Sequence, residues 1–497
     1  MLADHIVGQF GNAQLAAGVC LVGMLIYVAN TIIYSFFFSP VRHVPGPWWA
    51  RTSRLPLLWA TYQRRRSKYA TSLLQRYGPI VVIAPDQIHT TDSTAMKTIY
   101  NRRSLKTSFY AGMGSWKGVT STLGFIDYAS AAPTRNNLIQ CFQNNNLDTL
   151  TGNMSSHIAE FCDILRERKG EDIDGVVLFR LLALDIVTDV LWGERKTLLS
   201  SMTDETPVFL RRFHAFSSYN AMKSFIPGLD TLVRWFGSAT WKQLRQDCSD
   251  MDVTAKDALQ RWQTSSEHRD RDVLSMLKFM NGAEEERKRI PNSHIPAYMV
   301  EMLAAGSSTT SHTATFACYE LMRHPKEAGR LREELESAFP NKDNIDETKT
   351  MQLPFLDSVL RETMRLMPMI PGPLPRYLGD SIDVRGYQVP PGVVASTAAI
   401  DQGRLPSIYP EPDTWKPERW LEATDEMHLN WTPFGYGSRS CPGSNLAMTE
   451  LKYMLGTIFR LFRVEGPQKH IQKDLDLVDV FVSGEKSGHC WLRFVEV

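Results

Sequence analysis

The sequence lacks several features that are typical of common protein classes. Its seven cysteines include no pair in C-x-x-C spacing, and their odd number argues against a disulfide framework or a structural zinc site. The 55 basic and 54 acidic residues leave a net charge of only +1, which predicts no nucleic-acid partner. No internal repeat, low-complexity segment or dinucleotide-binding glycine fingerprint is present in the 497 residues. We therefore expect one large domain in a reducing compartment.

Charge is also absent from one long stretch near the N-terminus. Between His5 and Val41 there is no Asp, Glu, Lys or Arg, and apolar side chains dominate residues 15–38. A transmembrane helix needs roughly 20 such residues. Basic residues then follow, with no acidic residue until Asp86, so the positive-inside rule places the bulk of the chain in the cytosol. Residues 1–40 are thus predicted to be a single-pass membrane anchor ahead of a domain of residues 41–497.

The most informative stretch present is FGYGSRSCPG, residues 434–443. Cys441 stands two residues after Arg439, directly before a segment of residues 445–462 with helical apolar periodicity. A helix start stabilises a thiolate through its N–H donors and positive dipole end, and an arginine can direct a fork of donors at an acidic group nearby. A flat macrocycle that carries iron and two propionates fits this arrangement, and the alternative is that Cys441 is an ordinary loop cysteine.

This stretch resembles the haem-ligand loop of the cytochrome P450 family, phenylalanine-x-x-glycine-x-arginine-x-cysteine-x-glycine. Phe434, Arg439, Cys441 and Gly443 occupy the matching positions. The resemblance covers nearly the whole chain after the first forty residues, and it implies a mainly α fold with small β-sheets and one haem-thiolate catalytic domain. It also implies haem b as cofactor, with the Cys441 thiolate as the axial iron ligand that favours O–O cleavage.

A second landmark is the helix expected over residues 293–322. Its middle carries five hydroxyl side chains in a row, residues 307–311, and such hydroxyls most often bend a helix locally. The resemblance instead aligns this part with the oxygen-activation groove of the family. Thr309 then takes the threonine position, and Gly306 leaves room for dioxygen.

Ser308 departs from the family pattern, which has a carboxylate just before the threonine. A carboxylate relays protons efficiently, whereas a serine passes a proton only through ordered water. Three alternatives follow: a water-linked Ser308–Thr309 relay, a group supplied by the substrate, or a reaction that depends less on fast proton delivery.

A third landmark concerns Glu362 and Arg365, which lie at i and i+3 of an expected helix. The resemblance implies that they lock together with Arg419 behind the haem loop, in a structural role.

The resemblance also implies that arginines bind the haem propionates. Arg439 is one of them by its place before Cys441, and Arg376 and Arg135 match two others. The tryptophan or histidine usual four residues before Arg135 is Ala131 here, which leaves one propionate without its usual partner.

The substrate cavity is predicted by family position. It would be built from residues 109–128, from one face of the long helix, and from residues 369–374 and 481–482; the helix face comprises Met299, Met302, Ala305 and Thr309. Residues 103–132 are typical of a long functional loop rather than a packed element. The apolar and aromatic lining predicts a hydrophobic, polycyclic substrate. The overall resemblance favours a fungal secondary metabolite of the terpenoid or indole-alkaloid type.

Together these features predict a monooxygenase in the endoplasmic reticulum membrane with its catalytic domain in the cytosol. NADPH–cytochrome P450 reductase would supply the electrons, with cytochrome b5 as a further candidate donor. Oxidative coupling or ring formation without oxygen insertion is the alternative, which Ser308 would permit. A haem-binding protein that does not turn over is a third hypothesis, and Thr309 argues against it because a carrier would not need this residue.

Overall fold

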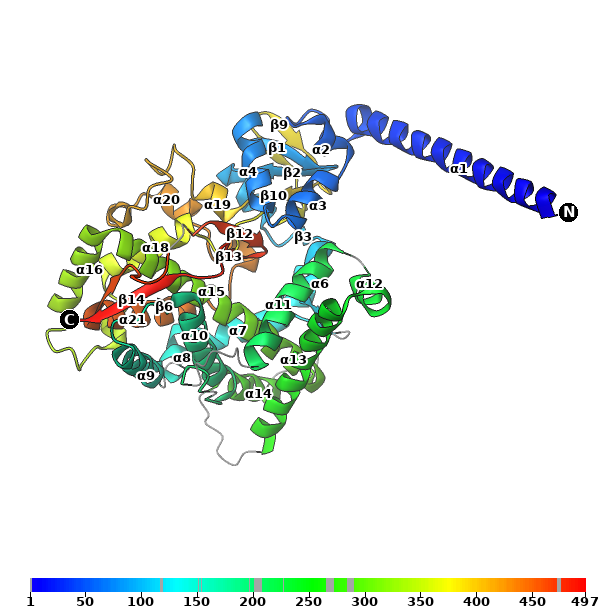
Figure 1. Cartoon of the computed structure of the whole chain (residues 1–497). Coiled ribbons are helices and arrows are strands. Elements are labelled where there is room, and N and C mark those ends of the chain that lie inside the picture. Colours follow the sequence, from blue (N-terminus) through cyan, green and yellow to red (C-terminus); the bar gives the residue numbers. More distant parts are fainter. Residues whose placement is uncertain are drawn as a thin grey trace.

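Helices dominate the computed structural model, and small sheets lie beside them (Figure 1). The structure describes the chain except residues 1, 117–118, 151, 153, 196, 201–207, 227, 265–271, 284–289 and 472–474. The helices of the first half are α1 (Leu2–Ile33), α2 (Trp48–Thr52), α3 (Leu55–Tyr62), α4 (Arg66–Tyr77), α5 (Ser93–Ile99), α6 (Ser108–Gly114), α7 (Tyr128–Cys141), α8 (Asn144–Leu150), α9 (Met154–Glu167), α10 (Gly175–Trp192), α11 (Val208–Phe225) and α12 (Leu229–Phe236). The remaining helices are α13 (Ala239–Thr264), α14 (Val273–Ala283), α15 (Ile295–Arg323), α16 (Pro325–Ala338), α17 (Glu347–Thr350), α18 (Pro354–Leu366), α19 (Ala399–Gln402), α20 (Asp425–Asn430) and α21 (Ser444–Leu461).

The strands form one five-stranded sheet and several smaller ones. The larger sheet has the order β1-β2-β10-β7-β3, and its strands are β1 (Ile80–Ala84), β2 (Gln87–Thr90), β10 (Val394–Ser396), β7 (Arg376–Tyr377) and β3 (Leu105–Lys106). The smaller sheets contain β4 (Ser115–Trp116), β5 (Val119–Thr120), β6 (Ile173–Asp174), β8 (Ile382–Val384), β9 (Tyr387–Val389), β11 (Phe462–Glu465), β12 (Leu477–Val480), β13 (Val482–Glu485) and β14 (Trp491–Glu496). The predicted mainly α fold with small sheets is confirmed.

Helix α1 projects away from the body of the molecule (Figure 1). It continues through a π-helical turn, Tyr34–Phe38, and the part Ala17–Phe38 is long and apolar enough to cross a membrane. The described side chains along it are almost all exposed to solvent. The described apolar side chains of this helix therefore pack against almost no other part of the protein.

Helix α15 runs through the core, packed lengthwise against α10. Pro296 stands in its first turn, where proline is tolerated, and the chain turns at His324 before the next helix starts with Pro325. Helix α10 is buried on nearly all sides, which explains its almost continuous apolar sequence, and Gly193 ends it in the left-handed region at φ +67°. The predicted helix over residues 293–322 is confirmed, with bounds one or two residues away.

One carboxylate joins helix α18 to the chain that leads to the C-terminal loop. Glu362 Oε1 accepts hydrogen bonds from Arg365 Nη2 at 2.8 Å, Arg419 Nε at 3.0 Å and the backbone N–H of Lys416 at 2.8 Å. Glu362 Oε2 accepts from Arg365 Nε at 2.8 Å and from Trp420 Nε1 at 2.9 Å. The predicted triad of Glu362, Arg365 and Arg419 is therefore present, and both partners of the central pair are fully buried.

The prediction of a long loop without packed elements over residues 103–132 is wrong in part. This region contains α6 and the short hairpin of β4 and β5. Their close packing depends on two glycines, because a Cβ on Gly114 would lie 2.1 Å from the backbone nitrogen of Gly124. Glycine-rich sequence suggested a loop, whereas here glycine permits direct backbone contact.

Candidate functional site

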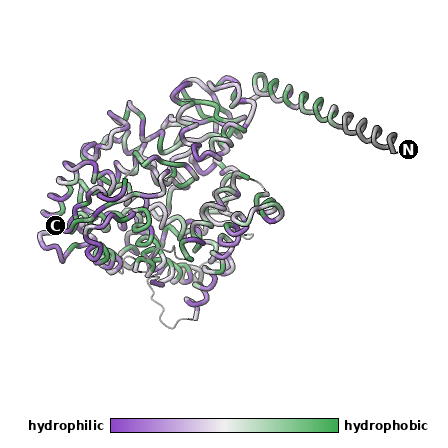
Figure 2. Tube along the Cα trace, in the orientation of Figure 1, coloured by the Kyte–Doolittle hydropathy of each residue, from purple (hydrophilic) through white to green (hydrophobic). Residues whose placement is uncertain are grey.

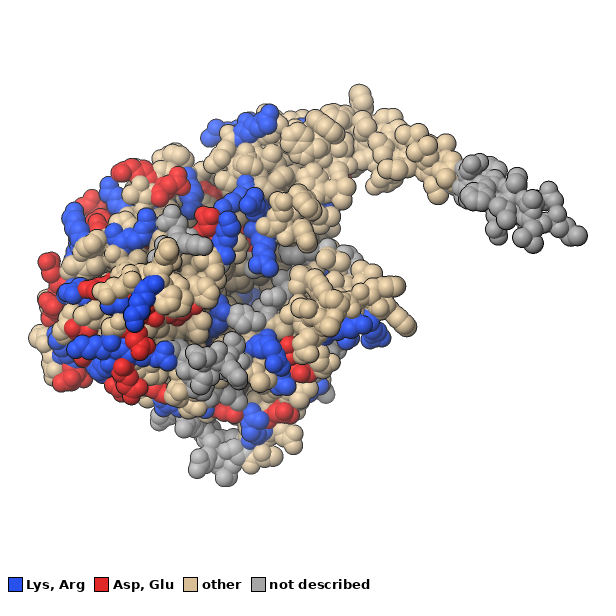
Figure 3. All heavy atoms as spheres, in the orientation of Figure 1, with Lys and Arg blue, Asp and Glu red and all other residues tan. Residues whose placement is uncertain are grey.

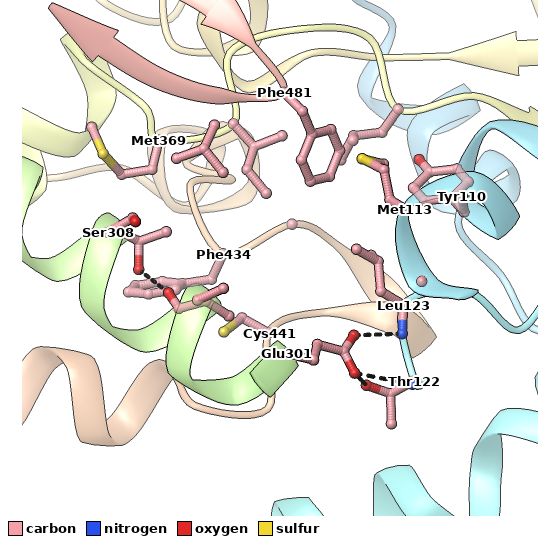
Figure 4. A pocket seen from close by; sticks show the side chains of 18 of the residues that line it. Tyr110, Met113, Thr122, Leu123, Glu301, Ser308, Met369, Phe434, Cys441 and Phe481 are labelled. Atoms are coloured by element: carbon pink, nitrogen blue, oxygen red, sulfur yellow. Dashed lines mark hydrogen bonds between the residues drawn. The ribbon is translucent and has the colours of Figure 1, made fainter. Parts of the chain in front are cut away.

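A cavity of about 1340 Å³ lies at the centre of the molecule, between the helical core and the larger sheet. Its walls come from α3, α6, α7, α11, α15 and α21, from residues 121–123, 369–376 and 432–443, and from the turn at residues 481–482. Figure 4 shows Cys441 and Ser308 among the lining residues, with Phe481, Met113 and Tyr110 contributed by other elements. Most of the lining is apolar or aromatic.

The loop before α21 presents the thiol of Cys441 to this cavity. The Cys441 backbone N–H donates to the carbonyl of Phe434 at 2.8 Å, which closes the loop. Gly437 has φ +69°, and a Cβ on it would lie 2.4 Å from the carbonyl oxygen of Tyr100, so only glycine fits there. Burial raises the pKa of the Cys441 thiol, while the Gly443 backbone N–H and the charge of Arg135 lower it.

The three arginines predicted from the sequence all line the cavity. Arg439 donates to the carbonyls of Phe125 at 3.1 Å and Ile126 at 2.9 Å. The pKa of Arg439 is lowered to about 10, mainly by burial and in part by repulsion from Arg376 and Arg135. Burial is also the main cause that lowers the pKa of Arg135.

A fourth cation at this edge, Lys106, was missed at the sequence level. Its side chain is buried, and the pKa of Lys106 is held well below its usual 10.5 by burial and by the charges of Arg376 and Arg439. Lys106 lines the same cavity as Ala131, which stands where the resemblance leads one to expect a propionate partner. A lone lysine in β3 carries no sequence pattern, so no signal could have singled it out.

These residues fit a haem group. Buried cations that lower one another's pKa are stabilised by an anion placed among them, and haem carries two propionates. Gly443 lines the same cavity, and a Cβ on it would meet no protein atom within 4 Å, which leaves space for a flat ring. Cys441 would hold the iron, and Arg135, Arg376, Arg439 and Lys106 would hold the propionates; Phe434 lines the cavity beside the thiol loop.

Helix α15 brings the predicted hydroxyls to the cavity wall. Thr309 Oγ1 donates to the carbonyl of Ala305 at 2.6 Å, which leaves its lone pairs to accept from a donor in the cavity. Ser308 lines the cavity as well, whereas Ser307 is buried and donates back to Leu303 at 2.6 Å. Only part of the run of five hydroxyls therefore faces the site.

The backbone at Ser308 is held by a histidine that the sequence reasoning missed. His312 Nδ1 lies 2.6 Å from the Ser308 carbonyl, and His312 Nε2 lies 3.1 Å from Arg180 Nη2 on α10. Since the carbonyl only accepts and the guanidinium only donates, Nδ1 carries the proton and Nε2 accepts. The spacing of 308 and 312 on one helix face is the signal that could have identified this residue.

One of the predicted cavity positions on α15 lies elsewhere, and Gly306 has a second role. Met302, Ala305 and Thr309 line the cavity as predicted, but the prediction for Met299 is wrong because its side chain is buried in the core. Gly306 reaches the cavity with its backbone, while a Cβ on it would lie 3.1 Å from Val187 Cγ2. Its missing side chain therefore permits close packing of α15 on α10.

A further missed residue is Glu450 on α21, which lines the cavity with almost no solvent exposure. Its Oε1 atom has no hydrogen-bond partner within the described part of the chain. Burial raises the pKa of Glu450 from its ordinary 4.5 to about 8, so the carboxyl is protonated at neutral pH.

This raised pKa predicts a pH-dependent stability. The unfolded chain loses the Glu450 proton near pH 4.5, whereas the folded protein keeps it until about pH 8. Stability present below pH 4.5 is therefore lost as the pH rises towards 8, by at most about 1.4 kcal/mol per pH unit. Glu450→Gln has no proton to lose. In urea unfolding, the free energy of unfolding of this variant relative to the wild type should therefore increase as the pH rises from 4.5 to about 8. A constant difference, or the same trend in the exposed control Glu426→Gln, would contradict the assignment.

Comparison with known proteins agrees with this site. The family model for Cytochrome P450 matches residues 45–490. Cytochrome P450 monooxygenase BipB of Cochliobolus sativus is 26% identical over 465 residues, which is 89% of each chain. Cytochrome P450 monooxygenase BOT1 of Botryotinia fuckeliana is 24% identical, with 92% of each chain covered, and stcB of Emericella nidulans is 26% identical over 90% of this chain and 87% of its own. The chain therefore belongs to the cytochrome P450 family of monooxygenases, which bind haem b.

Proposed function

We propose that this protein is a membrane-anchored monooxygenase that oxidises a hydrophobic, polycyclic secondary metabolite of the terpenoid or indole-alkaloid type. Electrons would come from NADPH–cytochrome P450 reductase, with cytochrome b5 as a second candidate donor, because the sequence has no dinucleotide-binding fingerprint. The observation that carries the proposal is the large apolar cavity that ends at the Cys441 thiol. The similar proteins from fungi, all named monooxygenases, support a role in fungal secondary metabolism.

The cavity lining supports the substrate class. Met113, Leu123, Met369, Ile370 and Phe481 present flexible or aromatic apolar surface, which suits a rigid hydrocarbon framework. Phe481 packs against Phe109 with ring centroids 5.8 Å apart, so the far wall is a fixed aromatic surface. Few polar side chains would orient such a ligand, and its shape would decide which carbon approaches the haem.

The chemistry is divided between the cofactor and the chain. Haem b, when bound, supplies the dioxygen and one-electron chemistry. Cys441 would hold it from one side, and the hydroxyls of Thr309 and Ser308 would hold and pass protons on the cavity wall. Gly306 is proposed to leave room for dioxygen with its backbone, beside its packing role.

Ser308 keeps the second candidate function open. A serine needs water to pass a proton, so a reaction that depends less on fast proton delivery, such as oxidative coupling or ring formation, is compatible with this residue. Glu450 on α21 also lines the cavity with a protonated carboxyl, whereas position 308 lacks the carboxylate that the family pattern has there.

The surface around the cavity mouth supports a membrane partner. Leu55, Trp59 and Tyr62 on α3 and Trp235 and Phe236 on α12 are each at least 60% exposed. Both helices lie on the side of the body from which α1 projects (Figure 1). Figure 2 marks hydrophobic residues along α12, and Figure 3 shows few charged side chains on this side. Residues of α3 also line the cavity, so an apolar substrate could reach it from lipid.

The role of Cys441 predicts a spectroscopic result. Cys441→Ala should abolish the Soret band that is specific for thiolate ligation in the reduced carbon monoxide complex, because alanine cannot bind iron. Cys20→Ala, which changes an exposed cysteine in α1, is the matched control and should keep the band. A Cys441→Ala protein that keeps the band would refute the proposed iron ligand.

The proposed relay predicts how electrons are used. Thr309→Ala should raise the fraction of NADPH electrons released as hydrogen peroxide, since general acid assistance is worth about 10²–10⁴-fold. Ser308→Asp restores the family's usual carboxylate and should keep or improve coupling if the reaction is hydroxylation. If the reaction is ring formation, this variant should divert product towards hydroxylated forms. Unchanged coupling and products in both variants would mean that the protons arrive by another route.

The proposed membrane contacts predict two levels of vesicle binding. A chain that starts at Val41 should bind haem normally but sediment less with phospholipid vesicles, because the apolar α1 is gone. Adding Trp235→Ser and Phe236→Ser should weaken the remaining binding further. The exposed change Glu426→Gln in the same shortened chain is the control. Full vesicle binding after both steps would exclude α1 and α12 as membrane contacts.

A further inference from the structure

We propose that Glu301 is a positioning residue that determines substrate specificity, because its carboxylate fixes residues 121–123 as one wall of the cavity. The proposal rests on the proposed function in one respect, since it takes this cavity as the substrate site. The clamp itself is a feature of the protein that stands apart from catalysis.

The first side of the clamp is the set of bonds that Glu301 accepts. Its Oε1 accepts from the Leu123 backbone N–H at 2.8 Å, and its Oε2 accepts from the Thr122 hydroxyl at 2.9 Å and the Thr122 N–H at 3.2 Å (Figure 4). A carboxylate accepts through both oxygens, so one side chain satisfies three donors. Glu301 lies eight residues before Thr309 on α15, about 12 Å along the helix axis.

The second side of the clamp is Lys106. Its Nζ donates to the Leu123 carbonyl at 2.7 Å and to the Thr122 carbonyl at 3.4 Å. The peptide groups of this segment are thus held by two oppositely charged side chains rather than by a helix or a sheet. The same lysine belongs to the cation edge described above, so the segment is fixed between the hydroxyl-bearing helix and the proposed propionate side.

Burial and the attraction between the two side chains act in opposite directions on the pKa of both groups of the clamp. Burial raises the pKa of Glu301, and the bonds from Leu123 and Thr122 and the charge of Lys106 lower it. Lys106 is stabilised in turn by Glu301. Within the described part of the chain, Lys106 is the cation that most affects the pKa of Glu301, and Glu301 is the carboxylate that most affects the pKa of Lys106. The two side chains are therefore interdependent.

The clamp reaches the adjacent cavity wall on α6 through backbone contacts. Ser121 donates to the Gly114 carbonyl with its N–H at 2.7 Å and its hydroxyl at 2.9 Å. Gly114 also packs directly on Gly124. Because Gly114 ends α6, which carries Tyr110 and Met113, a shift of the clamped segment moves that wall too. Loosening the clamp should therefore change the shape of the cavity rather than one contact.

The test compares matched carboxamide variants on one helix. Glu301→Gln keeps the size of the side chain but replaces one acceptor oxygen with an NH₂ group that opposes the backbone donors. Glu320→Gln, also on α15 and buried away from the cavity, is the control. Hydrogen exchange is measured on the full-length haem-loaded protein without substrate. We expect the amides of Thr122 and Leu123 to exchange about tenfold faster or more in Glu301→Gln and to be unchanged in Glu320→Gln.

The second readout is ligand selectivity. Terpenoid and indole compounds of graded size are titrated, and their Kd values are measured from the shift of the haem spin state. Glu301→Gln should change the ratio of Kd values for large and small ligands by about tenfold, whereas Glu320→Gln should leave it unchanged. If Glu301→Gln does not fold, Thr122→Val removes one donor of the clamp and should give the same changes at a few-fold level.

The two readouts separate the possible failures. Unchanged amide exchange would overturn the clamp. Faster exchange with unchanged Kd ratios would overturn its role in specificity. A wild-type protein that binds none of the compounds would instead refute the proposed substrate class, and the exchange experiment would still decide whether the clamp exists.

Discussion

The arrangement of the site depends on one buried carboxylate. Glu362 accepts five hydrogen bonds, from two arginines, a tryptophan and a backbone N–H, and so joins α18 to the segment that precedes the thiol loop. Such a charge is tolerated in the core only when every lone pair is used, and removing one charged partner typically costs about 3–5 kcal/mol. The network therefore fixes the chain near residues 416–420, about twenty residues before Cys441. The place of the thiol relative to the helical core follows from this constraint.

The cavity divides into a charged edge and an apolar remainder. Lys106, Arg135, Arg376 and Arg439 share the edge, and burial with mutual repulsion lowers the pKa of Lys106 and Arg439. Burying several cations together lowers the stability of the folded protein unless an anion binds among them. The edge therefore serves to bind an anion and does not itself stabilise the fold. The remainder can then select a ligand by shape, because most of its lining is apolar or aromatic.

Helix α15 connects the part of the site that shapes the cavity with the part that carries the hydroxyl side chains. Glu301 in its N-terminal half binds residues 121–123. Ser308 and Thr309 lie in its middle. His312 bonds to the backbone of Ser308 and to Arg180 of α10. Gly306 lets α15 approach Val187 of α10 closely. A single rigid helix thus keeps the wall that shapes the cavity at a fixed distance from the hydroxyls. Ser308, which stands in place of the family's carboxylate, changes the chemistry at the middle of α15 without changing how the helix is packed.

The sequence by itself determined the features that are local in the chain. The thiol loop around Cys441, the helices α15 and α21 and the apolar stretch before Val41 each follow from residue types at fixed spacing, and the structure contains all of these elements. The Glu362 triad could also be predicted, because the resemblance supplied the long-range partner Arg419.

Only the tertiary structure decided which side chains meet across distant elements. Lys106 and Glu450 come from a short strand and from a late helix, and no spacing links either of them to Cys441. The direction of Met299 into the core and of Gly306 towards Val187 depends on how α15 is rotated against α10, which periodicity alone leaves open. The pairing of Glu301 with residues 121–123 joins positions about 180 apart in the chain. Hydrogen bonds and burial of this kind are set by packing in three dimensions, and a one-dimensional pattern contains no record of them.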